Sequence, residues 1–146
     1  MNTSPEFKKC LEHNKIKKFS SGRKLMAKEL KLAQEDLRLS LRNLNEGNYR
    51  WSIVQSYYSM FHSARVLLYS KNYREKNHFC LIIAVRSLFV ETGKLNFSFI
   101  EFLLEAKHLR EAADYYGDFS EVNSRKLVKK AKYFLKIVKE VTSVQK

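Results

Sequence analysis

The sequence has few of the residues that bend a chain sharply. Its 146 residues include one proline and four glycines. Compact β-sheet domains need many tight turns, which these two residues favour, so their scarcity argues against a sheet protein. Apolar residues nevertheless make up 45% of the chain, which is enough for one hydrophobic core. The composition therefore predicts a single all-α domain built from a few long helices.

Cysteines, long apolar runs and ligand motifs are scarce as well. Cys10 and Cys80 are the only two cysteines, and because they lie far apart with no secretory signal, we expect separate reduced thiols in the cytoplasm. No stretch approaches the roughly 18 apolar residues of a membrane span, so no membrane attachment is expected. The spacing of the four histidines supports no metal site, and no phosphate loop or other cofactor motif is present.

Positive charge is concentrated at the two ends of the chain. The net charge is +13, of which residues 1–31 carry +6 and residues 124–146 carry +7, while 32–123 is neutral. If the two ends lie side by side, they form one positive face that attracts polyanions, RNA above all. A solvated face that only confers solubility explains the same charge. The candidate phosphate contacts are Lys129, Lys130, Lys132 and Lys136.

Apolar residues recur at three- and four-residue steps, which is typical of amphipathic helices. Residues 1–20 lack this periodicity, and we expect them to form a basic arm with one short helical turn, ahead of a domain over 21–146. Short connections between the helices predict one antiparallel four-to-five-helix bundle. The expected helices are 21–45, 49–71, 78–92, 97–115 and 124–142.

The second of these helices is apolar over a wide arc and is expected at the centre of the bundle. We expect its tryptophan and most other aromatic side chains in the core. Gly47 is expected to end the helix before it, and Asn96 and Asn123 to cap the last two helices. One stripe of the second helix joins Trp51, Val54, Tyr58, Phe61, Arg65 and Leu68.

The same helix carries the first of four short motifs. Residues 57–65 read Y-Y-S-M-F-H-S-A-R, and the others are Y-R-E-K-N-H at 73–78, E-T-G-K-L at 91–95 and L-R-E-A-A-D-Y at 109–115. In this order and spacing they resemble the small stand-alone HEPN proteins of archaea and bacteria. The resemblance covers nearly the whole chain. It implies a helical bundle that dimerises, an RNA-linked role, and toxin-like pairing with a small nucleotidyltransferase.

The resemblance also implies a site for chemistry. Many HEPN relatives are ribonucleases that need no metal and use the pattern R-x(4–6)-H. Here Arg110 matches the arginine, but the residue five positions on is Tyr115. Because a phenol with a pKa near ~10 is a poor base at neutral pH, we expect no strong ribonuclease activity. His62 is then the candidate base, and Arg110 still offers a phosphate contact.

Two interpretations are open for the end of this fourth helix. Arg110 and Asp114 lie four residues apart and can simply pair on the helix surface. Alternatively, the two residues and Tyr115 form a phosphate or nucleotide clamp, or Tyr115 or Tyr116 is exposed to modification by a partner enzyme.

The two central histidines are also open to two interpretations. His62 is either a hydrogen-bonded core residue or part of a groove with Tyr58 and Arg65 along the same helix face. His78 either caps the start of its helix or completes that groove, since helix N-termini favour anions.

The function stays open between different classes. One candidate is an RNA-binding or weakly ribonuclease-like toxin component of a two-component module, which the basic ends favour. The other is a non-catalytic dimeric module that binds a nucleotidyltransferase, which the missing motif histidine favours. Nucleotide binding without RNA is a third possibility.

Overall fold

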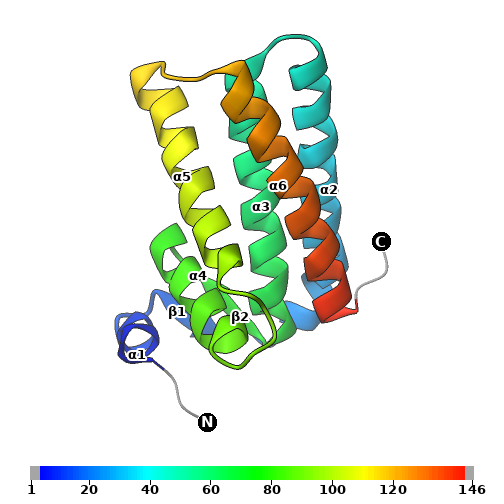
Figure 1. Ribbon diagram of the computed structural model, residues 1–146. Coiled ribbons are helices and arrows are strands. Elements are labelled where there is room, and N and C mark those ends of the chain that lie inside the picture. The colour runs from blue at the N-terminus through cyan, green and yellow to red at the C-terminus, as the bar shows by residue number, and fades with distance from the viewer. Residues whose placement is uncertain (1–3, 144–146) are drawn as a thin grey trace.

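Four long helices run antiparallel along one axis (Figure 1). They are α2 (Gly22–Asn45), α3 (Tyr49–Ser70), α5 (Ser98–Tyr116) and α6 (Glu121–Thr142). This computed structural model describes residues 4–143, so Lys146, counted above in the basic C-terminal segment, lies outside them. The predicted all-α bundle is confirmed, with helix boundaries close to those expected from the periodicity.

Helix α3 lies at the centre, as predicted, and contacts α2, α5, α6 and α4 (His78–Val85). Its contact with α2 is made by small side chains that the apolar periodicity did not reveal. The hydroxyls of Ser52 and Ser59 donate hydrogen bonds to the carbonyl oxygens of Ser40 (2.9 Å) and Ala33 (2.8 Å) on α2. The two backbones can therefore approach closely while these two buried hydroxyls keep hydrogen-bond partners.

The stripe expected to face the core on α3 is only partly buried. Phe61 is buried as predicted. Trp51 is 51% exposed, so its placement in the core was wrong, and Tyr58, which was expected either in the core or in a groove, is 41% exposed. Four helices cover the remaining sides of α3, and serines fill the side next to α2. The larger side chains Trp51 and Tyr58 therefore occupy the one side that stays open.

The helix ends follow the predicted capping chemistry at Gly47, and at Asn96 only in part, because the N-cap residue of α5 is Phe97. Gly47, with φ +80°, ends α2 in the left-handed region, and Asn96 accepts a hydrogen bond from the Ser98 amide at 2.8 Å. Asn123 is not the cap of α6, because Ser120 accepts from the Asn123 amide at 3.0 Å and starts the helix one turn earlier. The expected helix 78–92 is shorter and ends as a π-helical turn, η1 (Arg86–Val90).

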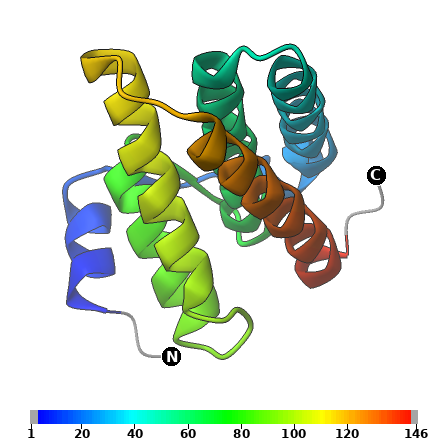
Figure 2. The ribbon, with the colours of Figure 1, turned by 45° about the horizontal axis from the view of Figure 1, so that its top comes forward.

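The N-terminal segment is more ordered than the single helical turn that its sequence predicted. It forms α1 (Pro5–Glu12) and β1 (Ile16–Lys18), and β1 pairs antiparallel with β2 (Tyr73–Glu75). The side chains of Phe7, Cys10 and Ile16 are buried in the main core. These apolar contacts hold the segment against the base of the bundle, beside α4 (Figure 2).

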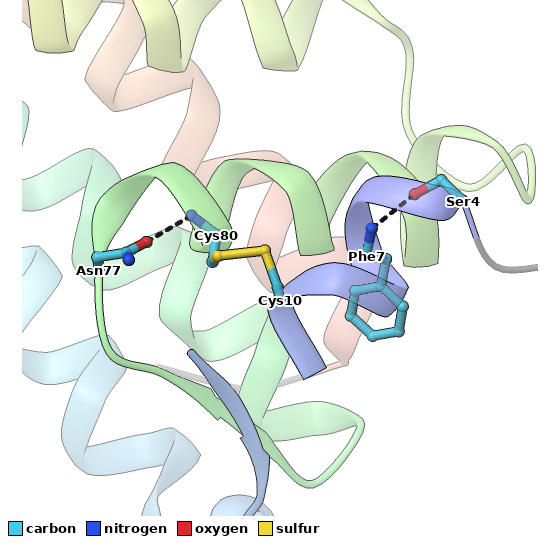
Figure 3. The surroundings of a disulfide bond; sticks show 5 residues. All are labelled: Ser4, Phe7, Cys10, Asn77 and Cys80. Carbon is cyan, nitrogen blue, oxygen red and sulfur yellow. Dashed lines mark hydrogen bonds between the residues drawn. A yellow bond between two sulfur atoms is a disulfide. The ribbon is translucent and has the colours of Figure 1, made fainter. Parts of the chain in front are cut away.

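A disulfide joins the N-terminal segment to the bundle. It links Cys10 on α1 to Cys80 in the first turn of α4 (Figure 3). The prediction of two separate thiols was therefore wrong, and the inference of a reducing compartment loses that support. A separation of 70 residues in the sequence gave no sign of the pairing, because only the packing of α1 against α4 brings the two sulfurs together.

The disulfide is expected to stabilise the fold. Closing a loop of 70 residues restricts the unfolded chain and is worth about 4 kcal/mol on the chain-entropy model. We expect a reductant to lower the free energy of unfolding of the native chain by roughly that amount in a denaturant titration. The double variant Cys10→Ala/Cys80→Ala is the control and should be insensitive to reductant. A native chain whose unfolding midpoint ignores reductant would contradict the assignment.

Candidate functional site

Arg110 lies on the inner side of α5, facing α3, and its side chain is only 16% exposed. Its guanidinium carbon is 4.7 Å from the ring centroid of Tyr57 on α3 and 5.6 Å from that of Tyr115. Its two terminal nitrogens donate to the hydroxyls of Tyr57 at 3.5 Å and Tyr115 at 3.3 Å. The guanidinium is therefore held between two phenol rings, which fix its direction.

Tyr57 connects Arg110 to a histidine on a third helix. Its side chain is fully buried, and its hydroxyl forms a hydrogen bond with Nδ1 of His78, the first residue of α4. The imidazole of His78 also stacks on the ring of Phe61, with centroids 4.3 Å apart. His78 is not the cap of α4, because the Asn77 side chain accepts the hydrogen bond from the Cys80 amide at 2.7 Å. The histidine side chain is thus available to the Arg110 site.

A single carboxylate serves two arginines beside this site. Asp114 lies 3.5 Å from Arg110, as the spacing suggested, and also 3.5 Å from Arg50 at the start of α3. Arg50 additionally donates to the Ala113 carbonyl oxygen at 3.2 Å. The Nε–H of Arg110 is buried and has no partner within residues 4–143. Two arginines share one carboxylate, so the site keeps a positive charge.

The surroundings of His78 favour its neutral form. Burial lowers the pKa of the imidazole, and the nearby cations Arg65, Arg110 and Lys107 act in the same direction, against the opposing effect of Glu75. The imidazole is therefore a free base at neutral pH. It is a proton acceptor, and the hydroxyl of Tyr57 connects it to the guanidinium of Arg110.

The tyrosine between the two groups stays protonated. Burial raises the pKa of Tyr57, and the hydrogen bond and charge from Arg110 only partly offset this rise. The guanidinium of Arg110 stays charged, because its phenol hydrogen bonds outweigh the effect of burial and raise its pKa. Taken together, Arg110, Tyr57 and His78 offer a phosphate-binding cation beside a proton acceptor.

Residues 26–141 match the family model of the HEPN domain. The chain belongs to the HEPN-domain family. It is 28% identical over 76% of its length to a Methanocaldococcus jannaschii protein named "Putative toxin MJ0605", covering 84% of that protein. It is 29% identical over 62% of its length to a second protein of that organism, "Putative toxin MJ0142", covering 61% of it. A Pyrococcus horikoshii protein, "UPF0332 protein PH1297", is 31% identical over 55% of the chain and is covered over 56%.

The HEPN domain holds His62 and Arg65 in a separate, acidic cluster. The two ring nitrogens of His62 face Glu29 and, at 3.5 Å, Asp36 on α2. Arg65 donates to Glu29 at 3.0 Å and to the buried Glu75 at 2.8 Å. Burial raises the pKa of Glu29, but the hydrogen bond from His62 and the charge of Arg65 outweigh it and lower the net pKa. His62 and Arg65 thus join α3 to α2 and β2 rather than to Arg110.

The remaining residue of the expected groove, Tyr58, packs beside the Arg110 site. Tyr58 is partly exposed, and its ring meets that of Tyr57 edge-on, with centroids 5.1 Å apart. The sequence analysis offered Tyr58, His62 and Arg65 as one possible groove because they share a helix face. It missed Tyr57 and Arg50 as site residues, since their partners lie on α5, more than 50 positions away.

The two basic segments of the chain, residues 1–31 and 124–146, lie side by side over only part of their length. Helix α6 packs on α2, whereas α1 and β1 pack on α4 and β2, on the other side of the base (Figures 1 and 2). Lys129, Lys132 and Lys136 line a groove of about 640 Å³ next to α2. Lys130 instead forms an ion pair with Glu105 on α5. Three of the four candidate lysines therefore share one surface.

Neither a metal-binding cluster nor a membrane-spanning helix is found within residues 4–143. Among residues 4–143, no group of three or more histidine, cysteine and carboxylate side chains could hold a metal ion. No helix within those residues is both long enough and apolar enough to cross a membrane.

The acidic cluster around Arg65 predicts a large stability effect. In Arg65→Met, Glu29 and Glu75 lose their counter-charge while their side chains are only 9% and 3% exposed. We expect the free energy of unfolding to fall by about 3–5 kcal/mol at neutral pH. The control is Arg38→Met, which breaks an exposed pair with Glu35 and should change nothing measurable.

The same variant predicts a pH dependence. The folded-state pKa of Glu29 is lowered, so its ionised form stabilises the native chain above the ordinary glutamate pKa. That stabilisation is lost as the pH falls through the lowered folded-state value. Acidification should therefore narrow the stability difference between the native chain and Arg65→Met, as measured by urea titrations. A difference that stays constant with pH would show that Arg65 acts only through packing.

Proposed function

We propose that this HEPN protein acts on RNA as the toxin-like component of a two-component module. Two relatives that it resembles are named putative toxins. The observation that carries the proposal is the placement of Arg110, Tyr57 and His78 in one hydrogen-bonded unit drawn from three helices. An RNA substrate would place the protein in the cytoplasm. The lysines of α6 would add phosphate contacts of a sequence-independent kind.

The arrangement suits phosphodiester cleavage without a metal. Arg110 would hold the phosphate and balance the charge that develops on it. The Tyr57 hydroxyl, which accepts from Arg110, would donate its own hydrogen to Nδ1 of His78. His78 would therefore accept the proton of a ribose 2′-hydroxyl through this phenol, which passes its hydrogen to Nδ1 as it takes up the substrate proton. The 2′-oxygen attacks phosphorus, the bond to the 5′-oxygen breaks, and that oxygen takes up a proton. In this account His78 replaces the histidine that the family pattern would place near Tyr115, so the expectation of no strong ribonuclease activity is revised.

A cleavage assay with chelator present tests this assignment. We expect the native chain to cut single-stranded RNA, and His78→Ala to lose about 10²-fold or more of the rate while still binding RNA. Arg110→Ala should lose both binding and cleavage, because it removes the phosphate contact. His108→Ala is the matched control, since this exposed histidine lies on α5 two residues before Arg110. His62→Ala should retain cleavage if it folds, because His62 belongs to the acidic cluster.

Three outcomes separate the parts of the proposal. RNA binding that depends on Arg110, without cleavage by the native chain, would leave a phosphate clamp and refute the catalytic role of His78. Cleavage by Tyr115→His alone would show that the family pattern, and not His78, supplies the base. A native chain that neither binds nor cuts RNA at moderate salt would refute the RNA-directed function.

We also propose that the protein forms a homodimer through the open side of α3. Trp51 and Tyr58 are large and exposed, and they lie seven residues, or about two helical turns, apart on this side. Such aromatic side chains are enriched at protein interfaces. Light scattering should give twice the chain mass of 17.3 kDa, and Trp51→Ser should shift it toward the monomer. Phe97→Ser, at an equally exposed aromatic residue at the start of α5, is the control that should remain dimeric.

A second candidate function is a non-catalytic module that binds a nucleotidyltransferase or a nucleotide. The observation that favours it is Tyr116, which is 82% exposed beside Tyr115 at the end of α5. Tyrosines so exposed at a helix end are accessible to a partner enzyme. Binding of a nucleotidyltransferase that is lost in Tyr115→Ala/Tyr116→Ala, by a chain that does not bind RNA, would favour this function.

A further inference from the structure

A second positively charged site lies at the opposite end of the bundle from the Arg110 site. It is a cavity of about 290 Å³ at the base, where α2 begins and α3 and α6 end (Figure 1). Three cations line it: Arg23 at the start of α2, Lys71 just after α3, and Lys94 in the loop between η1 and α5. Among residues 4–143, no carboxylate lines this cavity. The described residues therefore give the site no counter-charge of its own.

These three cations are exposed, and they differ in their pairing from three partly buried cations of the bundle. Arg65, Arg110 and Lys130 each form an ion pair with a carboxylate. None of Arg23, Lys71 and Lys94 forms an ion pair with any residue among 4–143. An unbalanced group of cations around a cavity attracts an anion from solution.

The backbone fixes the position of Arg23. A Cβ on Gly22 would lie 2.6 Å from the carbonyl oxygen of Tyr69, so only glycine lets the start of α2 lie so close to the end of α3. The Nε–H of Arg23 donates to the Ser70 carbonyl oxygen at 3.3 Å, and its amide donates to the Asn72 side chain at 3.4 Å. The guanidinium is therefore held at the cavity wall by contacts that leave its terminal nitrogens for a ligand.

The two lysines are brought together on the other wall. The ammonium of Lys71 lies 5.7 Å from the centroid of the Phe89 ring, which also lines the cavity. The adjoining ammonium of Lys94 lowers the pKa of Lys71, and burial and Arg23 act in the same direction. The like charges repel each other in the free protein, so an anion placed between them would relieve an unfavourable interaction as well as form new contacts.

We propose that this cavity binds a phosphate group, contacted by the side chains of Arg23, Lys71 and Lys94. Three convergent cations match a tetrahedral anion with more than one negative charge better than they match a single carboxylate. The cavity is also larger than a phosphate alone, which leaves room for an attached group. The phosphate belongs either to a small phosphorylated molecule or to an RNA backbone. This proposal is independent of the function proposed for the Arg110 site.

Calorimetric titration of the intact protein with inorganic phosphate, AMP and a short RNA tests the site. The pocket variant is Lys71→Gln/Lys94→Gln. The matched control, Lys17→Gln/Lys76→Gln, removes the same charge from a second close lysine pair that is exposed and lies outside the cavity. We expect the native chain and the control to bind phosphate, and the pocket variant to bind it roughly tenfold or more weakly. Sulfate should compete, whereas chloride at equal ionic strength should not.

A stability measurement guards against a variant that fails to fold. Without phosphate, the pocket variant should have a thermal midpoint equal to or above that of the native chain, because the substitution removes repulsion. Binding of phosphate or AMP identifies a small-molecule site, and binding of RNA alone, weakened in the pocket variant, identifies a backbone phosphate. Equal affinities in the native chain and a folded pocket variant, or no binding of any of the three probes, would overturn the proposal.

Discussion

The burial of α3 is the constraint on which the rest of the structure depends. Four helices surround it, so nearly every side chain on it needs a buried partner. Ser52 and Ser59 bond to carbonyl oxygens of α2, and Arg65 bonds to two buried carboxylates. Tyr57, whose ring is completely buried, can satisfy its hydroxyl only through Arg110 and His78. The same requirement for buried partners therefore produces both the stable core and the candidate site.

The need of the buried Tyr57 hydroxyl for partners also explains why the candidate site differs from the family's arginine–histidine pattern. In that pattern an arginine and a histidine lie on one helix, whereas here α5 supplies Arg110 and α4 supplies the histidine, through Tyr57. The disulfide lies two residues beyond His78, at Cys80, and ties the first turn of α4 to α1. The position of the imidazole is therefore fixed by its stacking on Phe61, by the hydrogen bond to Tyr57 and by the covalent link nearby.

The sequence predicted the features that depend on local spacing. The five helices, the left-handed residue Gly47 and the matching of Arg110 to the family motif all follow from residues close together in the chain. Features that depend on the assembled fold were missed or wrong: the disulfide, the β1–β2 pairing and the exposure of Trp51. The partnership of Tyr57 with His78 and Arg110 spans 21 and 53 positions. No local periodicity encodes it, and His62 was preferred because it shares a helix with the motif.

The central claim is that Arg110, Tyr57 and His78 act as one unit, and the most direct test is the NMR titration of the His78 ring. The account predicts a pKa below the ordinary histidine value of about 6.5 in the native chain. In Arg110→Ala that pKa should rise, because a neighbouring cation is removed, and in the native chain the ring signals should shift when RNA is added. A ring that titrates at the ordinary value, ignores Arg110→Ala and does not respond to RNA would contradict the account.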